Sequence, residues 1–516
     1  MITCFANEAF TDFNVAENVN KMELAIKLVK SQFGKTYPII IGGKKITTND
    51  LLISTNPSNP SEIIGKFSKA NVSQVNEAIE LASQTFTTWS RVSAEIRSRY
   101  ILRLANLMKE QKYELSAYLI LEIGKSYAEA DGDVAEAIDF CEFYAREMMR
   151  LAQMQPLIHY PGEENQLTYE ALGVVCVIPP WNFPLAILVG MTVAAIVSGN
   201  TVVLKPSSET PMIAYKFFEL MESINLPNGV LNFVPCSGSE VGDNLITHPK
   251  TRAIAFTGSK EVGLRINHLA SSVSPGQKWI KRCVLEMGGK DSIVVDSNTD
   301  LNKAATAIVA SAFGFQGQKC SACSRAIIHE TVYAEMVKLI VEKTQNLKIG
   351  DVAKSGIDFG PVSSKSAYKS ILEYIEIAKS EGKILTGGNI VKLNDGYFIE
   401  PTVVGDVDPL ARISQEEIFG PVLALIKAKS FFEAIDIANN TEYGLTGGVF
   451  TNNREYLEYA RVHFHVGNLY LNRKCTGALV GVQPFGGFNM SGTDSKAGGR
   501  DYLLLFTQGK VVAERF

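Results

Sequence analysis

The side chain best suited to covalent chemistry is the thiol of Cys320, in the segment FGFQGQKCSACS. Gly314 and Gly317 precede it and give the backbone freedom to bring a thiol close to a ligand. A single cysteine is more often an inert core residue than a nucleophile, so the thiol alone does not define a site. Cys323 follows at the spacing of a redox pair, an alternative that stays open. The sequence has no second pair that could complete a zinc site.

Two more polar residues lie where a thiol nucleophile would need them. Asn182 follows the apolar run GVVCVI in the proline-restricted loop PPWNFP, and its amide can donate a hydrogen bond to a developing oxyanion. Glu286 comes at the end of the run CVLEMGG, a suitable position for a general base. Thiol, amide donor and carboxylate together indicate a reaction centre, although each alone has a structural explanation.

An alternation of strands and helices positions these residues. The runs GVVCVI, TVVLKP, VLNFVP, AIAFTGS and CVLEMGG, with helices expected at 185–198, 209–224 and 239–247, predict parallel βαβ units. Ligand sites of such sheets lie at the carboxyl ends of the strands. A second set after Ser324, with strands near AIIHE, ILTGG, TVVGDV, VLALIKA and NLYLN and helices near 331–347, 366–381 and 431–440, predicts a second α/β domain. The chain before about Ala152 shows helical periodicity.

Composition excludes several classes of function. Hydrophobic residues make up 46% of 516 residues and the net charge is -4, which leaves no basic surplus for nucleic acid or anionic lipid. Residues 171–204 carry no charge, but prolines interrupt the stretch, so we expect buried elements and no membrane span. Eight cysteines and a start without the features of a signal peptide favour the cytoplasm. His463 and His465 alternate on an expected strand without companion ligands, and no metal is predicted.

The end of the chain, DYLLLFTQGKVVAERF, reads as strands remote from both cores. Exposed strands of this kind usually need a partner, so we expect a homodimer or a higher homo-oligomer.

These residues resemble the aldehyde dehydrogenase superfamily over nearly the whole chain. The resemblance rests on the blocks PWNFP, GNTVVLKP, FTGS, LEMGGK, FGFQGQKC, EEIFGP and PFGGFNMSG, in that order. It implies an α/β fold with an atypical Rossmann cofactor domain at 1–287, a catalytic domain at 288–490, and a small β oligomerisation element formed by 155–172 and 491–516. It also implies that Cys320 is the nucleophile, that Glu286 activates water, and that Asn182 and the Cys320 amide bind the oxyanion.

The resemblance further implies a nicotinamide cofactor, NAD. Ser259, after Gly258 in FTGSKEVG, begins a helix whose amides can meet pyrophosphate. Lys205 is expected at the adenosine ribose, and Glu417 with Phe419 at the nicotinamide end, while Pro180 and Trp181 complete the cofactor site. NAD-preferring relatives carry an acidic residue where this chain has Ser208, so NADP is expected as a second cofactor.

Within the superfamily, the blocks DVAEAIDFCEFYAREM, PGQKWIKR and CTGALVGVQPFGGFNMSGT resemble the bacterial pyrroline-5-carboxylate dehydrogenases. That resemblance implies glutamate γ-semialdehyde as substrate, from proline, arginine or ornithine, with any proline dehydrogenase a separate protein. Ser321, Gly477 and Ala478 would bind its carboxylate, Phe183 and Phe485 would enclose its aliphatic part, and Glu136 would face its ammonium. For Glu136, a solvated helix face is the alternative.

Three alternatives remain at this point. The substrate could be a different aliphatic or amino aldehyde. A coenzyme A-dependent reaction is disfavoured, because such chemistry has no need of the water-activating Glu286. A non-catalytic or thiol redox-sensing protein is the alternative from another class, and the presence of Cys320, Glu286 and Asn182 argues against it.

Overall fold

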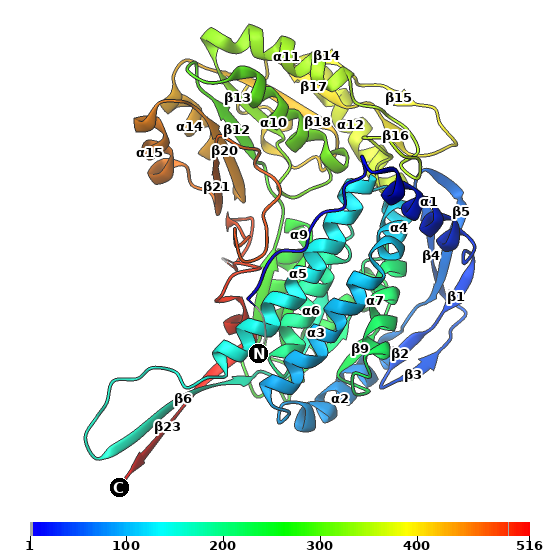
Figure 1. Cartoon of the computed structure of the whole chain (residues 1–516), viewed down its shortest axis with the longest axis vertical. Coiled ribbons are helices and arrows are strands. Elements are labelled where there is room, and N and C mark those ends of the chain that lie inside the picture. Colours follow the sequence, from blue (N-terminus) through cyan, green and yellow to red (C-terminus); the bar gives the residue numbers. More distant parts are fainter. Residues whose placement is uncertain (1–3, 494) are drawn as a thin grey trace.

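Two seven-stranded sheets form the framework of the computed structural model, which describes residues 4–493 and 495–516 (Figure 1). The first sheet has the spatial order β11 (Arg282–Glu286), β10 (Thr251–Thr257), β7 (Val174–Ile178), β8 (Thr201–Leu204), β9 (Leu231–Phe233), β2 (Ile39–Ile41) and β3 (Lys44–Ile46). The five strands from β11 to β9 are parallel, whereas β2 pairs antiparallel with β9 and β3. The predicted parallel βαβ units are therefore confirmed.

Helices cover both faces of the first sheet. They are α1 (Ala16–Lys30), α2 (Val72–Trp89), α3 (Ala94–Glu110), α4 (Lys112–Ile123), α5 (Tyr127–Leu151), α6 (Ala186–Val197), α7 (Pro211–Ser223), α8 (Gly238–Thr247) and α9 (Lys260–Ser271). Val175 and Val177 of β7 pack with α3 to α7, whereas Val174 and Cys176 pack with α2 and α8. Because β7 is buried on both faces, its sequence is a continuous apolar run.

The second sheet has the spatial order β14 (Lys383–Thr386), β17 (Thr402–Gly405), β18 (Val422–Ala428), β13 (Arg325–His329), β12 (Ser292–Val295), β20 (Thr446–Phe450) and β21 (Asn468–Leu471). Its helices are α10 (Leu301–Phe313), α11 (Tyr333–Gln345), α12 (Lys365–Glu381), α13 (Arg412–Gln415), α14 (Phe431–Asn439) and α15 (Arg454–His463). All neighbouring strands are parallel except β14 with β17. Along the chain the first strand of this sheet is β12. The sequence patterns had placed the start of the second domain's strands later, after Ser324.

Smaller elements complete the chain. They are β1 (Lys35–Tyr37), β4 (Leu51–Asn56) and β5 (Asn59–Ser68) in one sheet, the pairs β15 (Ile390–Val391) with β16 (Phe398–Ile399) and β19 (Tyr443–Gly444) with β22 (Phe488–Asn489), and the 3-10 turns η1 (Gly314–Gly317), η2 (Glu330–Val332) and η3 (Tyr502–Phe506). The strands between residues 35 and 68 were not predicted, because the prediction for the whole chain before about Ala152 is helical.

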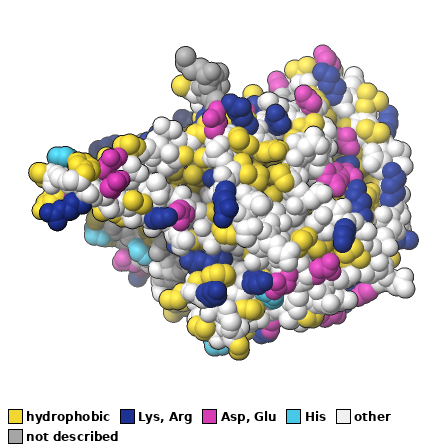
Figure 2. All heavy atoms as spheres, turned by 90° about the horizontal axis from the view of Figure 1, so that it is seen from below, with side chains coloured by type: hydrophobic (Ala, Val, Ile, Leu, Met, Phe, Trp, Pro, Cys, Tyr) yellow, Lys and Arg dark blue, Asp and Glu magenta, His cyan; other side chains and the backbone are white. Residues whose placement is uncertain are grey.

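A two-stranded ribbon projects from the rest of the chain (Figure 1). Its strands are β6 (Glu163–Ala171) and β23 (Thr507–Arg515), paired antiparallel over their full length. Figure 2 shows apolar side chains among charged ones on this projection, and Ile158, Val511 and Phe516 are 94%, 65% and 84% exposed. The prediction of strands from Asp501 onward is wrong for η3, because Tyr502, Leu503 and Phe506 are buried in the core around α5 and α6.

The expected strand through His463 and His465 is also wrong. His463 is the last residue of α15, where its ring stacks on Tyr459, and His465 follows in a loop. In the described residues no cluster of three or more His, Cys, Asp or Glu could hold a metal ion. Over the same residues, every helix is too short or too polar to cross a membrane.

Candidate active site

The loop that carries Cys320 has a constrained backbone. After α10 ends, Phe315 and Gln316 of η1 adopt left-handed conformations with φ of 49° and 56°. Gly317 follows with φ of 68°, and a Cβ atom there would lie 2.4 Å from the carbonyl oxygen of Gly420. Only glycine permits both the conformation and the contact. The Cys320 loop is therefore packed directly against the loop that contains Glu417 and Phe419.

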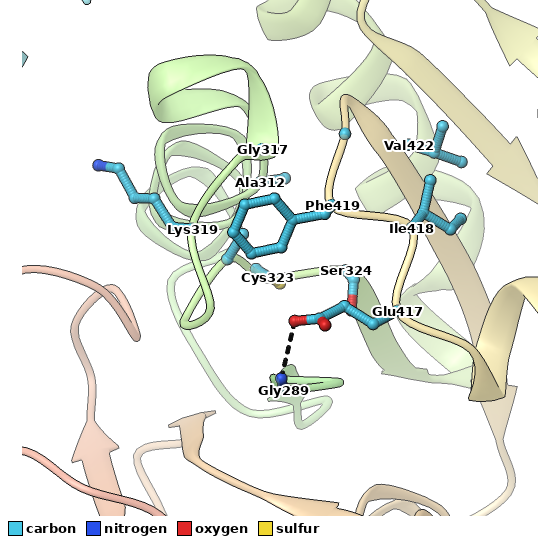
Figure 3. Close-up of a pocket in the computed structure, with 12 residues that line it drawn as sticks. Gly289, Ala312, Gly317, Lys319, Cys323, Ser324, Glu417, Ile418, Phe419 and Val422 are labelled. Carbon is cyan, nitrogen blue, oxygen red and sulfur yellow. Dashed lines mark hydrogen bonds between the residues drawn. The ribbon is translucent and has the colours of Figure 1, made fainter. Parts of the chain in front are cut away.

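Two glycines join this loop to the end of β11. A Cβ atom on Gly289 would lie 2.4 Å from the carbonyl oxygen of Cys320, and one on Gly288 would lie 2.2 Å from the carboxylate of Glu417. The backbone amide of Gly289 also donates to that carboxylate at 2.9 Å (Figure 3). The segment after Glu286 thus contacts both the Cys320 loop and Glu417, and side chains at these two positions would separate them.

Asn182 reaches the same loop from β7. Its side chain is buried, and its Nδ2 donates to the carbonyl of Gln318 at 3.1 Å. The side chain of Gln318 in turn accepts from the amide of Ser363 at 2.8 Å. The structure therefore brings the predicted amide donor to within two residues of Cys320 along the chain.

Glu286 is held at the end of β11 by the C-terminal part of the chain. Its carboxylate accepts from the hydroxyl of Ser495, and the amide of Leu285 donates to the hydroxyl of Thr493. The backbone carbonyl of Glu286 accepts from the amide of Gly258 at 3.0 Å. The candidate base and the candidate pyrophosphate loop consequently belong to one pair of parallel strands.

Electrostatics keep the thiol of Cys320 neutral. Burial raises its pKa well above the ordinary value, and the charges of Asp291, Glu417 and Glu286 add to the increase. A protonated thiol is a poor nucleophile, so Cys320 must transfer its proton to a base before it attacks. Burial also raises the pKa of Glu417 to about 7.

Cys323 is buried and makes different contacts. Its Sγ donates to the carbonyl of Arg325 at 3.3 Å, and its side chain hydrogen-bonds with that of Cys475. The described hydrogen bonds of Cys323 therefore lead away from Cys320, and they do not favour a Cys320–Cys323 redox pair.

The predicted cofactor residues Lys205 and Ser259 follow the carboxyl ends of β8 and β10, the strands on either side of β7. Lys205 comes after β8, and its buried ammonium donates to the carbonyl of Pro206 at 3.3 Å. Ser259 caps α9, where its hydroxyl accepts from the amide of Val262. Ser208 is exposed in the loop between β8 and α7. A buried cation and a helix N-terminus at the same edge of the sheet, on either side of β7, suit a ribose and a pyrophosphate.

Two aromatic side chains lie together where the nicotinamide end of the cofactor was predicted. Trp181 packs edge to face on Phe419, with ring centroids 5.3 Å apart, and follows the buried Pro180. Phe419 has φ of 55°, and its ring points into a pocket that Glu417, Gly289 and Cys323 also line (Figure 3). The residues predicted for the nicotinamide end therefore surround one pocket beside the Cys320 loop.

The predicted substrate residues divide into two groups. Phe183 lies under the ammonium of Lys125, 3.8 Å from its ring centroid, and Glu136 on α5 lies within range of the charge of the same lysine. Asp133 and Asp139, on the turns of α5 before and after Glu136, are buried, which excludes a solvated helix face. Burial and the charge of Asp133 raise the pKa of Glu136 to about 8.

The second group lies on the loop after β21. Gly477 has φ of 79° and accepts from Arg473 at 3.1 Å, with Ala478 next to it. Cys475 donates to the carbonyl of Ser321 at 3.6 Å, which brings this loop to the residue after Cys320. Phe485 is half-buried and exchanges backbone hydrogen bonds with Ala497.

Sequence reasoning missed a cluster of lysines beside these groups. Lys319 pairs with Glu129 at 2.7 Å, and its ammonium lies 5.8 Å from the ring centroid of Phe183. Lys125 pairs with Asp133 at 2.7 Å with both side chains fully buried. Burial opposes the charge of Glu129, yet Lys319, Lys125 and Lys474 together lower its pKa. The available signal was the position of Lys319 and Lys474 directly before Cys320 and Cys475.

Comparison with known proteins decides the family. The model of the aldehyde dehydrogenase family matches residues 46–512. The chain belongs to the aldehyde dehydrogenase family. This aldehyde dehydrogenase is 56% identical, over the full length of both chains, to a protein of Geobacillus sp. named 1-pyrroline-5-carboxylate dehydrogenase. It also resembles the solved 1-pyrroline-5-carboxylate dehydrogenase from Thermus with bound NAD, with a TM-score of 0.98 and 48% identity over all of both chains.

A third relative is a longer protein. The structure of proline utilization A from Bdellovibrio bacteriovorus is similar with a TM-score of 0.98 and 42% identity, covering 99% of this aldehyde dehydrogenase but 53% of the other chain. The family match and these two structures confirm the predicted α/β fold of an aldehyde dehydrogenase.

Proposed function

We propose that the chain oxidises L-glutamate γ-semialdehyde, in equilibrium with 1-pyrroline-5-carboxylate, to L-glutamate with NAD⁺ as acceptor. The family membership and the full-length relatives support the reaction. The observation that supports this substrate is the cluster of charged side chains next to Cys320, in which Lys125 is buried, Lys319 partly buried and Lys474 exposed. Lys125, Lys319 and Lys474 provide positive charge for a carboxylate, and Glu136 provides a carboxyl group for an ammonium.

In this mechanism Glu286 accepts the proton of the Cys320 thiol, directly or through water, and the thiolate attacks the aldehyde carbon. The resulting oxyanion accepts hydrogen bonds from Asn182 Nδ2 and the Cys320 amide, which requires Asn182 to exchange its bond with Gln318. The thiohemiacetal loses a hydride and becomes a thioester. Glu286 releases that first proton to solvent and then removes a proton from water, whose oxygen attacks the thioester carbonyl. The C–S bond breaks to give glutamate, and the proton on Glu286 passes to the sulfur and restores the thiol.

The cofactor, when bound, accepts that hydride. Lys205 and the amides at the start of α9, with Gly258 and Ser259, would hold its ribose and pyrophosphate. Glu417, Phe419, Pro180 and Trp181 would enclose its nicotinamide end. Ser208 carries no charge that would repel a 2′-phosphate, so we also propose that NADP⁺ is accepted.

For the substrate, Ser321, Gly477 and Ala478 would donate hydrogen bonds to the carboxylate, with Gly477 permitting close approach of the backbone. Phe183 and Phe485 would enclose the aliphatic carbons. A short aliphatic aldehyde carries neither charged group and gains nothing from the lysines or from Glu136.

Initial rates of NADH formation test the proposal. Equilibrated pyrroline-5-carboxylate and glutamate semialdehyde are compared with propanal, with NADP⁺ in parallel and Cys320→Ala as control. We expect a strong preference for the semialdehyde that disappears in Cys320→Ala. Equal or faster turnover of propanal would favour the second candidate, a different aliphatic or amino aldehyde, and would refute the substrate assignment.

Full activity of Cys323→Ser would remove the remaining support for redox sensing through this residue. We expect that outcome because the side chain of Cys323 is buried and bonded to Arg325.

The architecture and the comparisons support four further proposals. The first sheet ends with β11 and the second begins with β12, in keeping with domains at 1–287 and 288–490. The exposed ribbon of β6 and β23, within 155–172 and 491–516, would form a homodimer or higher oligomer. All eight cysteines are free thiols, which suits the cytoplasm. The likeness to half of a longer proline utilization protein favours a functional link to a separate proline-oxidising enzyme.

A further inference from the structure

The segment before α1 runs along α5 (Figure 1). We call residues 4–14 the N-terminal strap. Its contacts follow α5 from its C-terminal toward its N-terminal end: Phe5 with the ring of Phe143 (centroids 5.2 Å apart), the amide of Glu8 with Asp139 (2.7 Å), the amide of Thr11 with Asp131 (2.8 Å), and Phe13 with the ring of Tyr127 (centroids 5.3 Å apart). Lys112 of α4 adds a bond to the carbonyl of Ala9 at 2.7 Å. The strap is thus fixed to α5 at regular intervals.

One strap residue joins α5 to a second segment. The Nδ2 of Asn7 donates to Asp139 Oδ2 at 2.8 Å and to the carbonyl of Val480 at 2.9 Å. Both hydrogens of one amide are therefore used to connect helix and loop. Next to Val480, a Cβ atom on Gly481 would lie 3.0 Å from Phe5 and 3.1 Å from Phe143, so apolar contacts close the same junction.

The two segments that Asn7 connects carry opposite ends of the proposed substrate site. Glu136 lies three residues before Asp139 on α5, and Gly477 and Ala478 come directly before the turn at 479–483. At the other side of Glu136, Asp133 accepts from the amide of Ala186 at 2.7 Å and pairs with Lys125. The position of α5 relative to α6 is therefore fixed independently. Asn7 connects α5 directly to the loop, beside the indirect link from Gly481 through Gly498 to the hydroxyl of Tyr144.

We propose that Asn7 is a positioning residue that fixes the span between Glu136 and the Gly477–Ala478 backbone, so that the strap sets selectivity for an aldehyde with an ammonium and a carboxylate. This inference rests on the proposed function. A substrate held at both ends needs that span to be constant, because small displacements reduce productive binding. The rate of oxidation of an aldehyde without an ammonium and a carboxylate does not depend on this span.

The test compares Asn7→Ala and Asn7→Asp with the control Asn14→Ala in the full-length chain. Asn14 is exposed in the same strap and bonds to Asp12 within it. We expect both Asn7 variants to lose about tenfold in kcat/KM for glutamate semialdehyde through a higher KM, the loss expected for two hydrogen bonds. For propanal and for NAD⁺, kcat/KM should stay within about twofold of the original chain, and Asn14→Ala should change neither.

Hydrogen–deuterium exchange gives a readout that does not depend on the substrate. Residues 474–485 should exchange faster in both Asn7 variants than in Asn14→Ala. Equal losses for both aldehydes, or unchanged exchange in this loop, would overturn the proposal and leave the strap a purely structural element. If the original chain does not prefer the semialdehyde, the proposed function fails; faster loop exchange would then still support positioning by Asn7, without its role in selectivity.

Discussion

The carboxylate of Glu417 and the backbone amide of Gly289 are hydrogen-bonded at 2.9 Å. This bond joins the loop between α13 and β18 to the loop after β11, and Gly289 also lies against the carbonyl of Cys320. The candidate base, the candidate nucleophile and the carboxylate predicted to hold the nicotinamide therefore meet around two adjacent glycines, Gly288 and Gly289.

Replacement of Gly289 by alanine should damage this junction. The new Cβ would meet the Cys320 backbone, which cannot move without displacing the thiol, so we expect kcat to fall by at least about tenfold and stability by about 1–3 kcal/mol. In Gly288→Ala the added carbon meets the flexible end of Glu417, and the main effect should be a higher KM for NAD⁺. Steady-state kinetics and thermal unfolding distinguish the two. Equal behaviour of both variants would contradict this account.

Asn182→Ala should lower kcat by about 10²–10³-fold, the usual effect of losing one oxyanion donor. The KM for the aldehyde should change little, because the donor acts on charge that develops during the reaction. Single-turnover measurement of thioester formation is the direct check. A normal rate in Asn182→Ala would exclude Asn182 from the oxyanion site.

The pH dependence of kcat/KM for the semialdehyde should reflect the ionisation of Glu136. Burial raises its pKa to about 8, and only the ionised form attracts an ammonium, so kcat/KM for the semialdehyde should fall as the pH drops below about 8. In Glu136→Gln this limb should be absent, while propanal should show no difference between the two proteins. Hydration and cyclisation of the substrate also depend on pH, but they affect both proteins equally, so the comparison with Glu136→Gln controls for them.

The same shift has a consequence for stability. Because the folded pKa of about 8 exceeds the ordinary 4.5, the neutral form is favoured in the folded state. The stability contribution is complete below about pH 4.5 and is lost as the pH rises through about 8. The midpoint temperature of thermal unfolding of the original chain should therefore decline relative to that of Glu136→Gln over that interval.

Ser208→Asp should reduce the use of NADP⁺. Ser208 is exposed after β8, and a carboxylate there would repel the 2′-phosphate. We expect kcat/KM for NADP⁺ to fall by at least about tenfold with little change for NAD⁺. An unchanged ratio of the two cofactors would mean that this position does not face the ribose.

The proposal that the ribbon of β6 and β23 forms an oligomer interface can be tested by adding one charge to it. Val511 is 65% exposed on β23, and Val511→Asp should shift the protein to a smaller species in sedimentation velocity, because an interface would bury that carboxylate. Gln508→Glu, also on β23 and exposed, adds a charge on the opposite face and serves as control. Identical sedimentation of both variants and the original chain would argue against this face as the interface.

Sequence reasoning predicted the strand ends better than the side-chain network. The runs that became β7, β8, β10 and β11 are recognisable because strands buried on both faces are continuously apolar, and parallel pairing then brings their ends together. The Lys319–Glu129 and Lys125–Asp133 pairs were not predictable. The partners in each pair lie on separate elements, and a lysine in a sequence usually predicts a side chain that is exposed to solvent.

Local sequence patterns also gave the wrong secondary structure at two places where tertiary packing determines the conformation. The apolar residues of η3 suit a strand, but burial of Tyr502 and Phe506 against α5 and α6 favours a compact turn. His463 belongs to α15 and not to a strand, and its ring stacks on Tyr459 one turn earlier in the helix.

The bond from Ser495 to Glu286 spans 209 residues of sequence. During synthesis the thiol loop, the amide donor and the base all emerge from the ribosome before the residue that holds the base. A nascent chain therefore carries a complete set of reactive side chains while the carboxylate still lacks its hydroxyl partner. A chain whose translation stops before Ser495 should have the nucleophile but lack the hydroxyl that bonds to Glu286, so the final segment must be made before this contact to the base can form.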